Sequence, residues 1–271
     1  MSPHAYGRDP HDPRIGGGPE SPSLQVGKCR LGAGRTAIIV PLTGADTNAL
    51  SRQAVAARRE TATDILEWRV DALLAAGGDF EAAAEVVHDA IDGLPLLVTV
   101  RTTAEGGAVD LRGDDLLAMY DRVLAAQIAD LLDVQMLGEP QVAAAAVERA
   151  RAAKVPVLGS HHRMEETPSP LDMLDALVRI EEGGADLAKL SVMPSRRLDV
   201  LALMEASIAA TERLRIPMMT MSMGELGSLT RLAGGLLGQA ATFAAVEEIS
   251  APGQLPVHVV DAALEALGAR D

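Results

Sequence analysis

The stretch GADLAKLSVMP, residues 184–194, contains a predicted buried strand of the kind from which the fold can be predicted. It also contains a lysine, Lys189, that a buried strand does not explain. Leu187, Ala188, Leu190 and Val192 form a short apolar run, which predicts a buried strand. Amphipathic segments lie on both sides of it, PLDMLDALVRIEEG before and DVLALMEASIAATERL after. The same alternation of strand and helix recurs along the chain.

Eight apolar runs alternate in this way with amphipathic segments, and Pro and Gly mark the joins. The runs cover residues 37–42, 65–70, 94–101, 131–136, 155–160, 187–193, 217–223 and 240–246. Eight such units over roughly 230 residues predict an α/β protein of the (β/α)8 TIM barrel type, for which about 250 residues is typical. A doubly wound sheet is the alternative, but the even spacing and the lack of a Gly-rich first turn disfavour it.

The region before the first barrel strand falls into two parts. Residues 1–23 are rich in Pro, Gly and Ser, which predicts a disordered N-terminal tail. LQVGKCRLGAGRTAIIV, which follows, predicts a short β-hairpin around Gly32 and Gly34 that closes the bottom of the barrel. Residues 24–271 are then expected to form a single catalytic domain.

The composition argues against several classes of function. A formal net charge of −14 disfavours nucleic acid as a partner, because phosphate backbones bind basic surfaces. The single cysteine, Cys29, cannot form an intramolecular disulfide and suits a reducing compartment. No apolar run approaches the about 18 residues of a membrane span, and the N-terminus lacks a secretory signal pattern. We therefore expect a cytoplasmic protein without a membrane partner.

Lys189 is the residue that a buried strand does not explain. A buried ammonium is costly unless it is paired or loses its proton. The chain has only three lysines, and the other two lie beside predicted turns. One interpretation is an ion pair with a carboxylate of another strand region: Glu67, Asp71 or Asp133. The other is a lysine of lowered pKa that attacks a carbonyl group and forms an imine.

Polar residues also follow the other predicted strands, at the ends where TIM barrels carry their active sites. Glu67, Arg69 and Asp71 alternate in EWRVD, so they are expected to share one side of their strand. There they could form a buried ion network or bind a hydroxylated ligand. Arg101 and Glu105 follow the third strand, and an arginine offers a planar donor fork for hydroxyls or carboxylates.

The fifth strand is followed by the adjacent pair His161 and His162. Adjacent strand residues point to opposite sides, so at most one is expected to face a site. A histidine beside Lys189 would be a natural proton carrier. A metal site is disfavoured because no other His or Cys stands at a strand end. Arg231, near a predicted helix start, suits a carboxylate ligand.

Taken together, these motifs resemble the type I 3-dehydroquinate dehydratase family, the Schiff-base enzymes of the shikimate pathway. The resemblance spans residues 36–259 and rests on an ordered set of motifs: DILEWRVD, RTTAEGG, SHHRMEETP, GADLAKLSVMP, TMSMG, SLTRLAG, AATFAAV and SAPGQ. It implies a hydro-lyase that converts 3-dehydroquinate to 3-dehydroshikimate in aromatic amino acid biosynthesis. It also implies a homodimer and no metal or organic cofactor.

The resemblance assigns a role to each matching residue. Lys189 would form the imine with the substrate ketone, His162 would carry the protons, and Glu105 would orient or tune His162. Arg231 would bind the substrate carboxylate. The other substrate-binding residues that it implies are Glu67, Arg69, Arg101, Ser250 and Gln254 around the polar groups, and Met221, Met223 and Phe243 against the ring.

The chain departs from the family pattern at three positions near this site, one of which is His161, where an asparagine is often found. Pro41 stands where a serine is common, and Gln135 stands where a second carboxylate is often found. These latter two changes affect polar contacts, and all three leave the Lys189–His162 pair intact. Two other functions remain open from the residues: another Schiff-base barrel such as a class I aldolase, and a catalytically silent relative that only binds a ligand.

Overall fold

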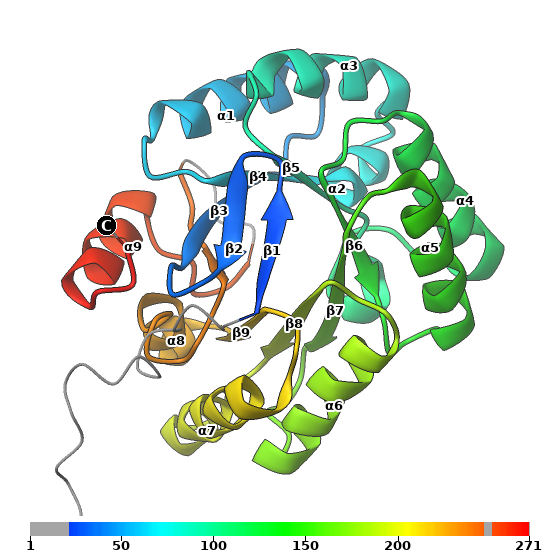
Figure 1. The fold of residues 1–271 in the computed structure, drawn as a ribbon. Helices are drawn as coiled ribbons and strands as arrows, with labels where there is room; N and C mark the ends of the chain where they lie inside the picture. The colour runs from blue at the N-terminus through cyan, green and yellow to red at the C-terminus, as the bar shows by residue number, and fades with distance from the viewer. Residues whose placement is uncertain (1–21, 247–250, 271) are drawn as a thin grey trace, which may run out of the picture.

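The computed structural model describes residues 22–246 and 251–270, and eight parallel strands form its main sheet. The strand order is β10-β3-β4-β5-β6-β7-β8-β9. The sheet nearly closes on itself, because the backbone N–H of Ala240, next to β10, donates to the carbonyl of Met218 on β9 at 2.8 Å. Helices surround the sheet (Figure 1). The predicted (β/α)8 TIM barrel is therefore confirmed.

Each barrel strand coincides with one of the eight apolar runs. The strands are β3 (Ala37–Leu42), β4 (Ile65–Arg69), β5 (Leu96–Thr99), β6 (Leu131–Gln135), β7 (Val157–Arg163), β8 (Leu187–Val192), β9 (Met218–Ser222) and β10 (Ala241–Phe243). Strand β7 continues three residues beyond its predicted end. The reason is its pairing with β8, which persists to Arg163 opposite Val192 and includes both histidines.

The helices begin where the sequence supplies capping groups. The side chains of Asp46, Asp79 and Ser169 accept hydrogen bonds from the first turns of α1, α3 and α6. The helices are α1 (Thr47–Arg59), α2 (Val70–Ala75), α3 (Phe80–Ile91), α4 (Gly113–Ala125), α5 (Pro140–Ala153), α6 (Pro170–Glu182), α7 (Arg197–Arg213), α8 (Ser228–Leu232) and α9 (Val257–Ala266), with 3-10 turns η1 (Thr103–Glu105) and η2 (Glu225–Gly227). Helix α8 is short because the glycine-rich segment around it breaks the helix.

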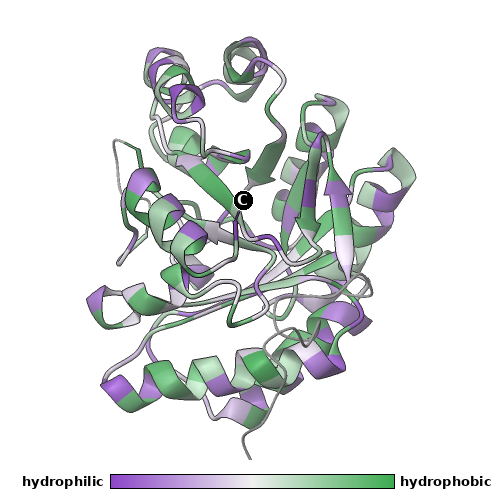
Figure 2. Ribbon diagram, turned by 60° about the vertical axis from the view of Figure 1, so that its left-hand side comes forward, coloured by the Kyte–Doolittle hydropathy of each residue, from purple (hydrophilic) through white to green (hydrophobic). Residues whose placement is uncertain are grey.

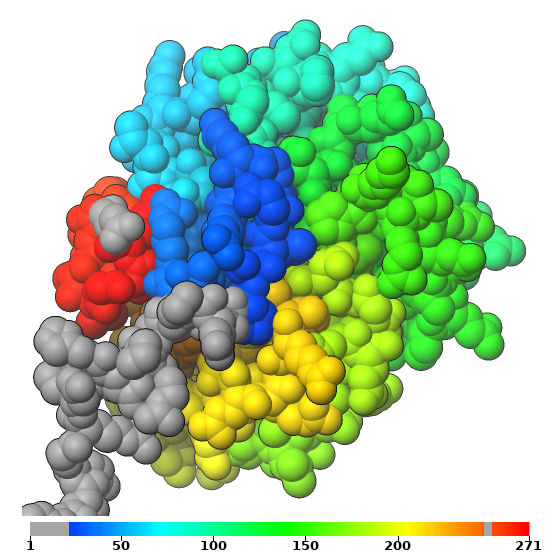
Figure 3. Space-filling model, viewed as in Figure 1, coloured from blue at the N-terminus to red at the C-terminus, as the bar shows by residue number. Residues whose placement is uncertain are grey.

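A two-stranded hairpin, β1 (Ser23–Val26) and β2 (Cys29–Gly32), covers the amino end of the barrel (Figures 1 and 3). The predicted position of its turn is wrong. Val26 pairs with Cys29, so the turn is formed by Gly27 and Lys28, with Gly27 at a φ of +51°. Gly32 and Gly34 instead lie where the chain leaves β2 for the barrel. Ser23 already belongs to β1, and residues 1–21 of the expected tail lie outside the described residues.

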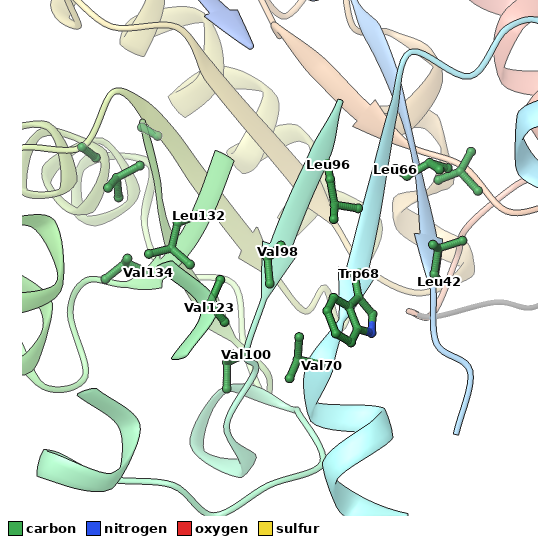
Figure 4. Packing of buried hydrophobic residues seen from close by; sticks show 14 of the residues in the cluster. Leu42, Leu66, Trp68, Val70, Leu96, Val98, Val100, Val123, Leu132 and Val134 are labelled. Atoms are coloured by element: carbon green, nitrogen blue, oxygen red, sulfur yellow. The ribbon is translucent and has the colours of Figure 1, made fainter. Parts of the chain in front are cut away.

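The apolar side chains pack in two shells. The outer shell, part of which Figure 4 shows around Trp68, fills the space between strands and helices. Trp68 stacks there on Phe80, with ring centroids 5.3 Å apart. The helices accordingly carry apolar and polar residues side by side along their length (Figure 2). The inner shell lies inside the barrel under the hairpin and includes Val26 and Leu31. In the described part of the chain, no helix is long and apolar enough to cross a membrane.

Candidate active site

A cavity lies at the carboxyl ends of the barrel strands, opposite the hairpin. It is open to solvent, and the space in and at the mouth of the cavity that no protein atom fills is about 580 Å³. Its lining contains these predicted site residues: Glu67, Arg69, Arg101, Glu105, His162, Lys189, Met221, Met223, Arg231, Phe243 and Gln254. The remaining predicted residue, Ser250, lies outside the described residues. The fold thus brings the predicted residues together from six different strands or their following loops, although their roles stay predictions.

Lys189 lies deep in this cavity, with 5% of its surface exposed. Its Nζ is 3.9 Å from Asp133 Oδ2 and 4.6 Å from the centre of the Phe243 ring. Of the three carboxylates considered as ion-pair partners, Asp133 is therefore the one within ion-pair distance. The ammonium is held by one loose ion pair and by a ring face, which leaves it poorly solvated.

Burial is the main cause that lowers the pKa of Lys189 to about 8 from its ordinary value of 10.5. Asp133 opposes this shift, whereas the positive charge of Arg101 adds to it. A pKa lowered from 10.5 to about 8 raises the fraction of neutral amine at pH 7 about 300-fold. Since the neutral amine is the nucleophile, the site favours attack by this lysine on a carbonyl group.

His162 faces Lys189 from the neighbouring strand β7. Its Nδ1 lies 2.8 Å from Glu105 Oε2. Burial, followed by the positive charges of Arg101 and Lys189, holds the pKa of His162 well below its usual range. The imidazole is therefore neutral near pH 7 and can accept a proton.

The two adjacent histidines share one partner, Glu105. His161 Nδ1 lies 3.2 Å from Glu105 Oε1, so both rings contact the same carboxylate. The reason is that Glu105 lies in the turn η1, which contacts β7, and each of its two carboxylate oxygens lies close to one of the rings. Only His162 of the pair lines the cavity.

Glu105 stays ionised between these rings. Burial alone would raise its pKa, but the hydrogen bonds with His161 and His162 and the charge of Arg101 outweigh burial and hold the pKa of Glu105 well below its usual range. An ionised Glu105 can fix the orientation of the His162 ring and stabilise it when it is protonated. This arrangement fits the predicted role of Glu105 as a partner of His162.

Arg101 is directed mainly at protein groups. Its Nη2 donates to Asp133 Oδ2 at 2.6 Å, and its Nη1 donates to Ser160 Oγ at 2.8 Å and to Glu105 Oε2 at 3.3 Å. Arg101 therefore connects the carboxylate beside Lys189 with the carboxylate beside His162. The planar donor fork of Arg101 thus binds groups of the protein itself. The predicted contact of Arg101 with the substrate stays a prediction.

The prediction that Asp71 shares a strand with Glu67 and Arg69 is wrong. Strand β4 ends at Arg69, and Asp71 lies in the first turn of α2. Asp71 nevertheless accepts two hydrogen bonds from Arg69, at 2.7 and 2.8 Å, and so holds this guanidinium at the cavity. Glu67 accepts a hydrogen bond from Thr99 Oγ1 at 2.8 Å and also lines the cavity.

Arg231 is buried, with 1% of its surface exposed, and lacks a carboxylate partner among residues 22–246 and 251–270. Its Nη2 donates to the carbonyl oxygen of Pro252 at 3.2 Å and its Nη1 contacts Met221 Sδ at 3.7 Å. Burial lowers the pKa of Arg231 to about 10, which still leaves it charged at pH 7. A buried, uncompensated guanidinium at a cavity favours an anionic ligand.

Gly106, Met164 and Ser191 also line the cavity, and the sequence analysis missed them. Ser191 could have been found from its spacing, because it stands two residues after Lys189 and shares its side of the strand. Gly106 and Met164 offered no comparable signal. Gln135, which stands where the family often has a carboxylate, binds Thr102. Its side chain accepts a hydrogen bond from the Thr102 N–H and donates one to the Thr102 hydroxyl, each at 2.9 Å.

Comparison with known proteins agrees with this geometry. The model of the type I 3-dehydroquinase family matches residues 38–271. A 3-dehydroquinate dehydratase of Aromatoleum aromaticum is 36% identical over 252 residues, which cover 90% of this chain and 95% of that protein. One of Shouchella clausii is 38% identical over 242 residues, 86% of this chain and 92% of that protein.

Solved structures give the same result. The 3-dehydroquinate dehydratase of Geobacillus kaustophilus HTA426 superposes with a TM-score of 0.85 at 32% identity, covering 91% of this chain and 97% of that chain. The type I 3-dehydroquinate dehydratase of Clostridium difficile, solved with covalent modified comenic acid, has a TM-score of 0.85 at 31% identity and covers 92% and 98%. The chain described here belongs to the type I 3-dehydroquinase family of hydro-lyases.

Proposed function

We propose that this enzyme removes water from 3-dehydroquinate to give 3-dehydroshikimate through an imine between the substrate ketone and Lys189. The observation that carries the proposal is a deeply buried lysine of lowered pKa in the same cavity as a neutral histidine and a buried arginine that has no carboxylate partner in the described residues. These groups supply a nucleophile, a proton carrier and an anion site. The covalent modification named for the C. difficile relative supports the proposal.

In the first step, the neutral amine of Lys189 attacks the ketone carbon and the ketone oxygen leaves as water. The protonated imine then withdraws electrons from the neighbouring carbon, which makes its hydrogen acidic. His162, neutral near pH 7, takes that proton, and Glu105 stabilises the resulting imidazolium. His162 then returns the proton to the departing hydroxyl group, and hydrolysis of the imine releases the product.

The remaining cavity residues are proposed to hold the substrate. Arg231 binds the carboxylate, because a charge-assisted bond to an anion would satisfy its Nε, which has no partner in the described residues. Glu67, Arg69, Arg101, Gln254 and Ser250 are proposed to bind the polar substituents. Met221, Met223 and Phe243 form an apolar wall against the ring, and Phe243 already lies beside the Lys189 amine.

Borohydride trapping tests the proposal. Reduction in the presence of 3-dehydroquinate should add the mass of the ligand to the peptide that carries Lys189, and without borohydride the conjugated enone product should absorb in the ultraviolet. Label on Lys28 or Lys154 would overturn the assignment of the nucleophile. Trapping without enone formation would instead favour an aldolase-type barrel, and binding without either would favour a silent relative.

We further propose that the enzyme acts as a homodimer in the cytoplasm, as a step of aromatic amino acid biosynthesis. Family membership supports the pathway and the dimer. The single cysteine, Cys29, is buried and suits a reducing compartment. Sedimentation of the purified full-length chain tests the dimer, which a monomer mass would contradict, and fractionation of the source cells tests the location.

A further inference from the structure

Two buried serine hydroxyls at the carboxyl ends of adjacent strands have no hydrogen-bond partner within the described part of the chain. They belong to Ser191 on β8 and Ser222 on β9. Both residues are almost completely buried, at 1% and 0% exposed surface. A buried hydroxyl without a partner destabilises the fold, so it calls for a physical reason.

The two hydroxyls differ in where they lie. Ser191 lines the cavity, whereas Ser222 does not. Ser191 follows Lys189 by two residues, so its side chain leaves the strand on the same side, one pleat nearer the open end of the barrel. In the strand register, Ser191 stands beside His162 on one side and Met221 on the other. The Ser191 hydroxyl therefore lies on the cavity wall beside His162 and one pleat above Lys189.

The neighbours of Ser191 do not use its hydrogen-bonding capacity. Met221 offers only a weak sulfur acceptor, and the Nδ1 of His162 is already bonded to Glu105. The free hydroxyl can donate one hydrogen bond and accept others. Since it is desolvated and lies above Lys189, the partner that fits it is an oxygen atom of a molecule bound to that lysine.

We propose that the Ser191 hydroxyl donates a hydrogen bond to the oxygen on the carbon that Lys189 attacks. This inference rests on the proposed function. As the Nζ–carbon bond forms, the carbonyl electron pair moves to this oxygen, which becomes anionic and then a hydroxyl. When the carbon–oxygen bond breaks, water leaves with two protons that come from the Lys189 ammonium by way of His162, and the nitrogen keeps one proton. Ser191 retains its own proton throughout.

Single-turnover trapping with matched variants tests the proposal. The rate at which 3-dehydroquinate becomes reducible by borohydride should fall about 5–10-fold in Ser191→Ala, the effect of one lost hydrogen bond. Ser222→Ala removes the same kind of hydroxyl away from the cavity and should leave this rate unchanged. Both variants should melt at or above the wild-type temperature, because each loses an unpaired buried hydroxyl.

The outcomes separate this inference from the proposed function. If wild type is trapped and Ser191→Ala is trapped just as fast, Ser191 has no such role and the proposed function stands. If Ser191→Ala is slower but also melts well below wild type, the loss is structural and the inference is overturned. If wild type itself gives no trapped adduct, the proposed function fails and this inference fails with it.

Discussion

The barrel interior is built differently at its two ends, although the same strands line both. At the amino end, the inward-facing positions carry aliphatic side chains that pack under the hairpin: Ile39, Ile65, Leu97, Leu131, Leu158 and Leu187. Two residues further along five of these strands stand Glu67, Thr99, Asp133, Ser160 and Lys189. Because inward positions recur every second residue, a single pleat separates an apolar layer from a polar one.

We expect the residues of the apolar layer to serve mainly the stability of the fold and those of the polar layer mainly the reaction. The apolar layer contributes burial of aliphatic surface and takes no part in the cavity. The polar layer holds charges that are costly to bury and keeps them in place by hydrogen bonds between strands, such as Ser160 Oγ to Asp133 Oδ1 at 2.7 Å. Substitutions in the two layers should therefore have opposite effects on stability and activity, which the following predictions test.

The largest expected effect is the loss of activity in Lys189→Met. Turnover should fall on the order of 10⁴-fold or more, because the covalent nucleophile is removed. The fold should persist at pH 7 with an equal or higher melting temperature, since an apolar chain of similar length replaces a buried ammonium. Steady-state rates and thermal unfolding measure the two effects. An unfolded variant would show that the polar layer is needed for stability after all.

His162→Ala is expected to have the next largest effect on turnover. General acid–base catalysis contributes about 10²–10⁴-fold, and a loss near the upper end is expected because one histidine serves two proton transfers. The trapped adduct should still form, since Lys189 remains, but more slowly, because His162 also relays the protons of imine formation.

His161→Ala is the matched control for this prediction. It removes a ring that contacts the same carboxylate but does not line the cavity, so it should reduce turnover much less. If His161→Ala were the inactive variant and His162→Ala the active one, the assignment of the proton carrier would be reversed.

In the apolar layer, Leu131→Ala should mainly change stability. Leu131 is fully buried and pairs in register with Leu97. Truncating such a side chain costs about 2–5 kcal/mol of unfolding free energy, through lost transfer energy and the cavity left behind. The value of kcat/KM should stay at the wild-type level where the variant is folded. Denaturant titration combined with kinetics checks this, and an activity loss in the folded variant would contradict the separation of the layers.

The contrast between the layers also explains what the sequence could predict. Apolar runs of four to eight residues mark strands directly, so all eight barrel strands were found. Lys189 was conspicuous because a charge interrupts such a run. The ends of strands were less predictable, since β7 continues through its histidines only because β8 lies alongside.

Contacts between distant segments were beyond the reach of the sequence. That Glu105 contacts both histidines depends on how the turn η1 folds over β7, 56 and 57 residues away along the chain. The use of Arg101 within the protein depends likewise on Asp133 and Ser160, which other strands supply. The hairpin turn was misplaced because Gly27 and the glycines at 32 and 34 give equivalent local signals.

The polar layer should also make stability depend on pH. The pKa of Lys189 is about 8 in the folded chain and 10.5 ordinarily, so between these values the unfolded chain binds the proton and the folded chain does not. Stability therefore rises with pH across this window, and the destabilisation from the buried ammonium is fully present below pH 8. Relative to Lys189→Met, wild type should gain roughly 2 kcal/mol between pH 7 and pH 10. A difference that stays constant with pH would refute the lowered pKa.

The smallest predicted effect compares one buried arginine from each end of the barrel. Arg270, at the amino end, pairs with Asp64 and Asp261, whereas Arg231, at the carboxyl end, has no carboxylate partner in the described residues. Arg231→Ala should lower kcat/KM at least ~10-fold, chiefly through KM, because a charged hydrogen bond is worth about 1.5–3 kcal/mol. Arg270→Ala should instead lower the melting temperature and leave KM unchanged, since it removes an ion-pair partner from Asp64 and from Asp261. Kinetics and thermal unfolding of both variants decide the matter: an unaltered KM in Arg231→Ala would mean that its guanidinium does not bind the substrate carboxylate.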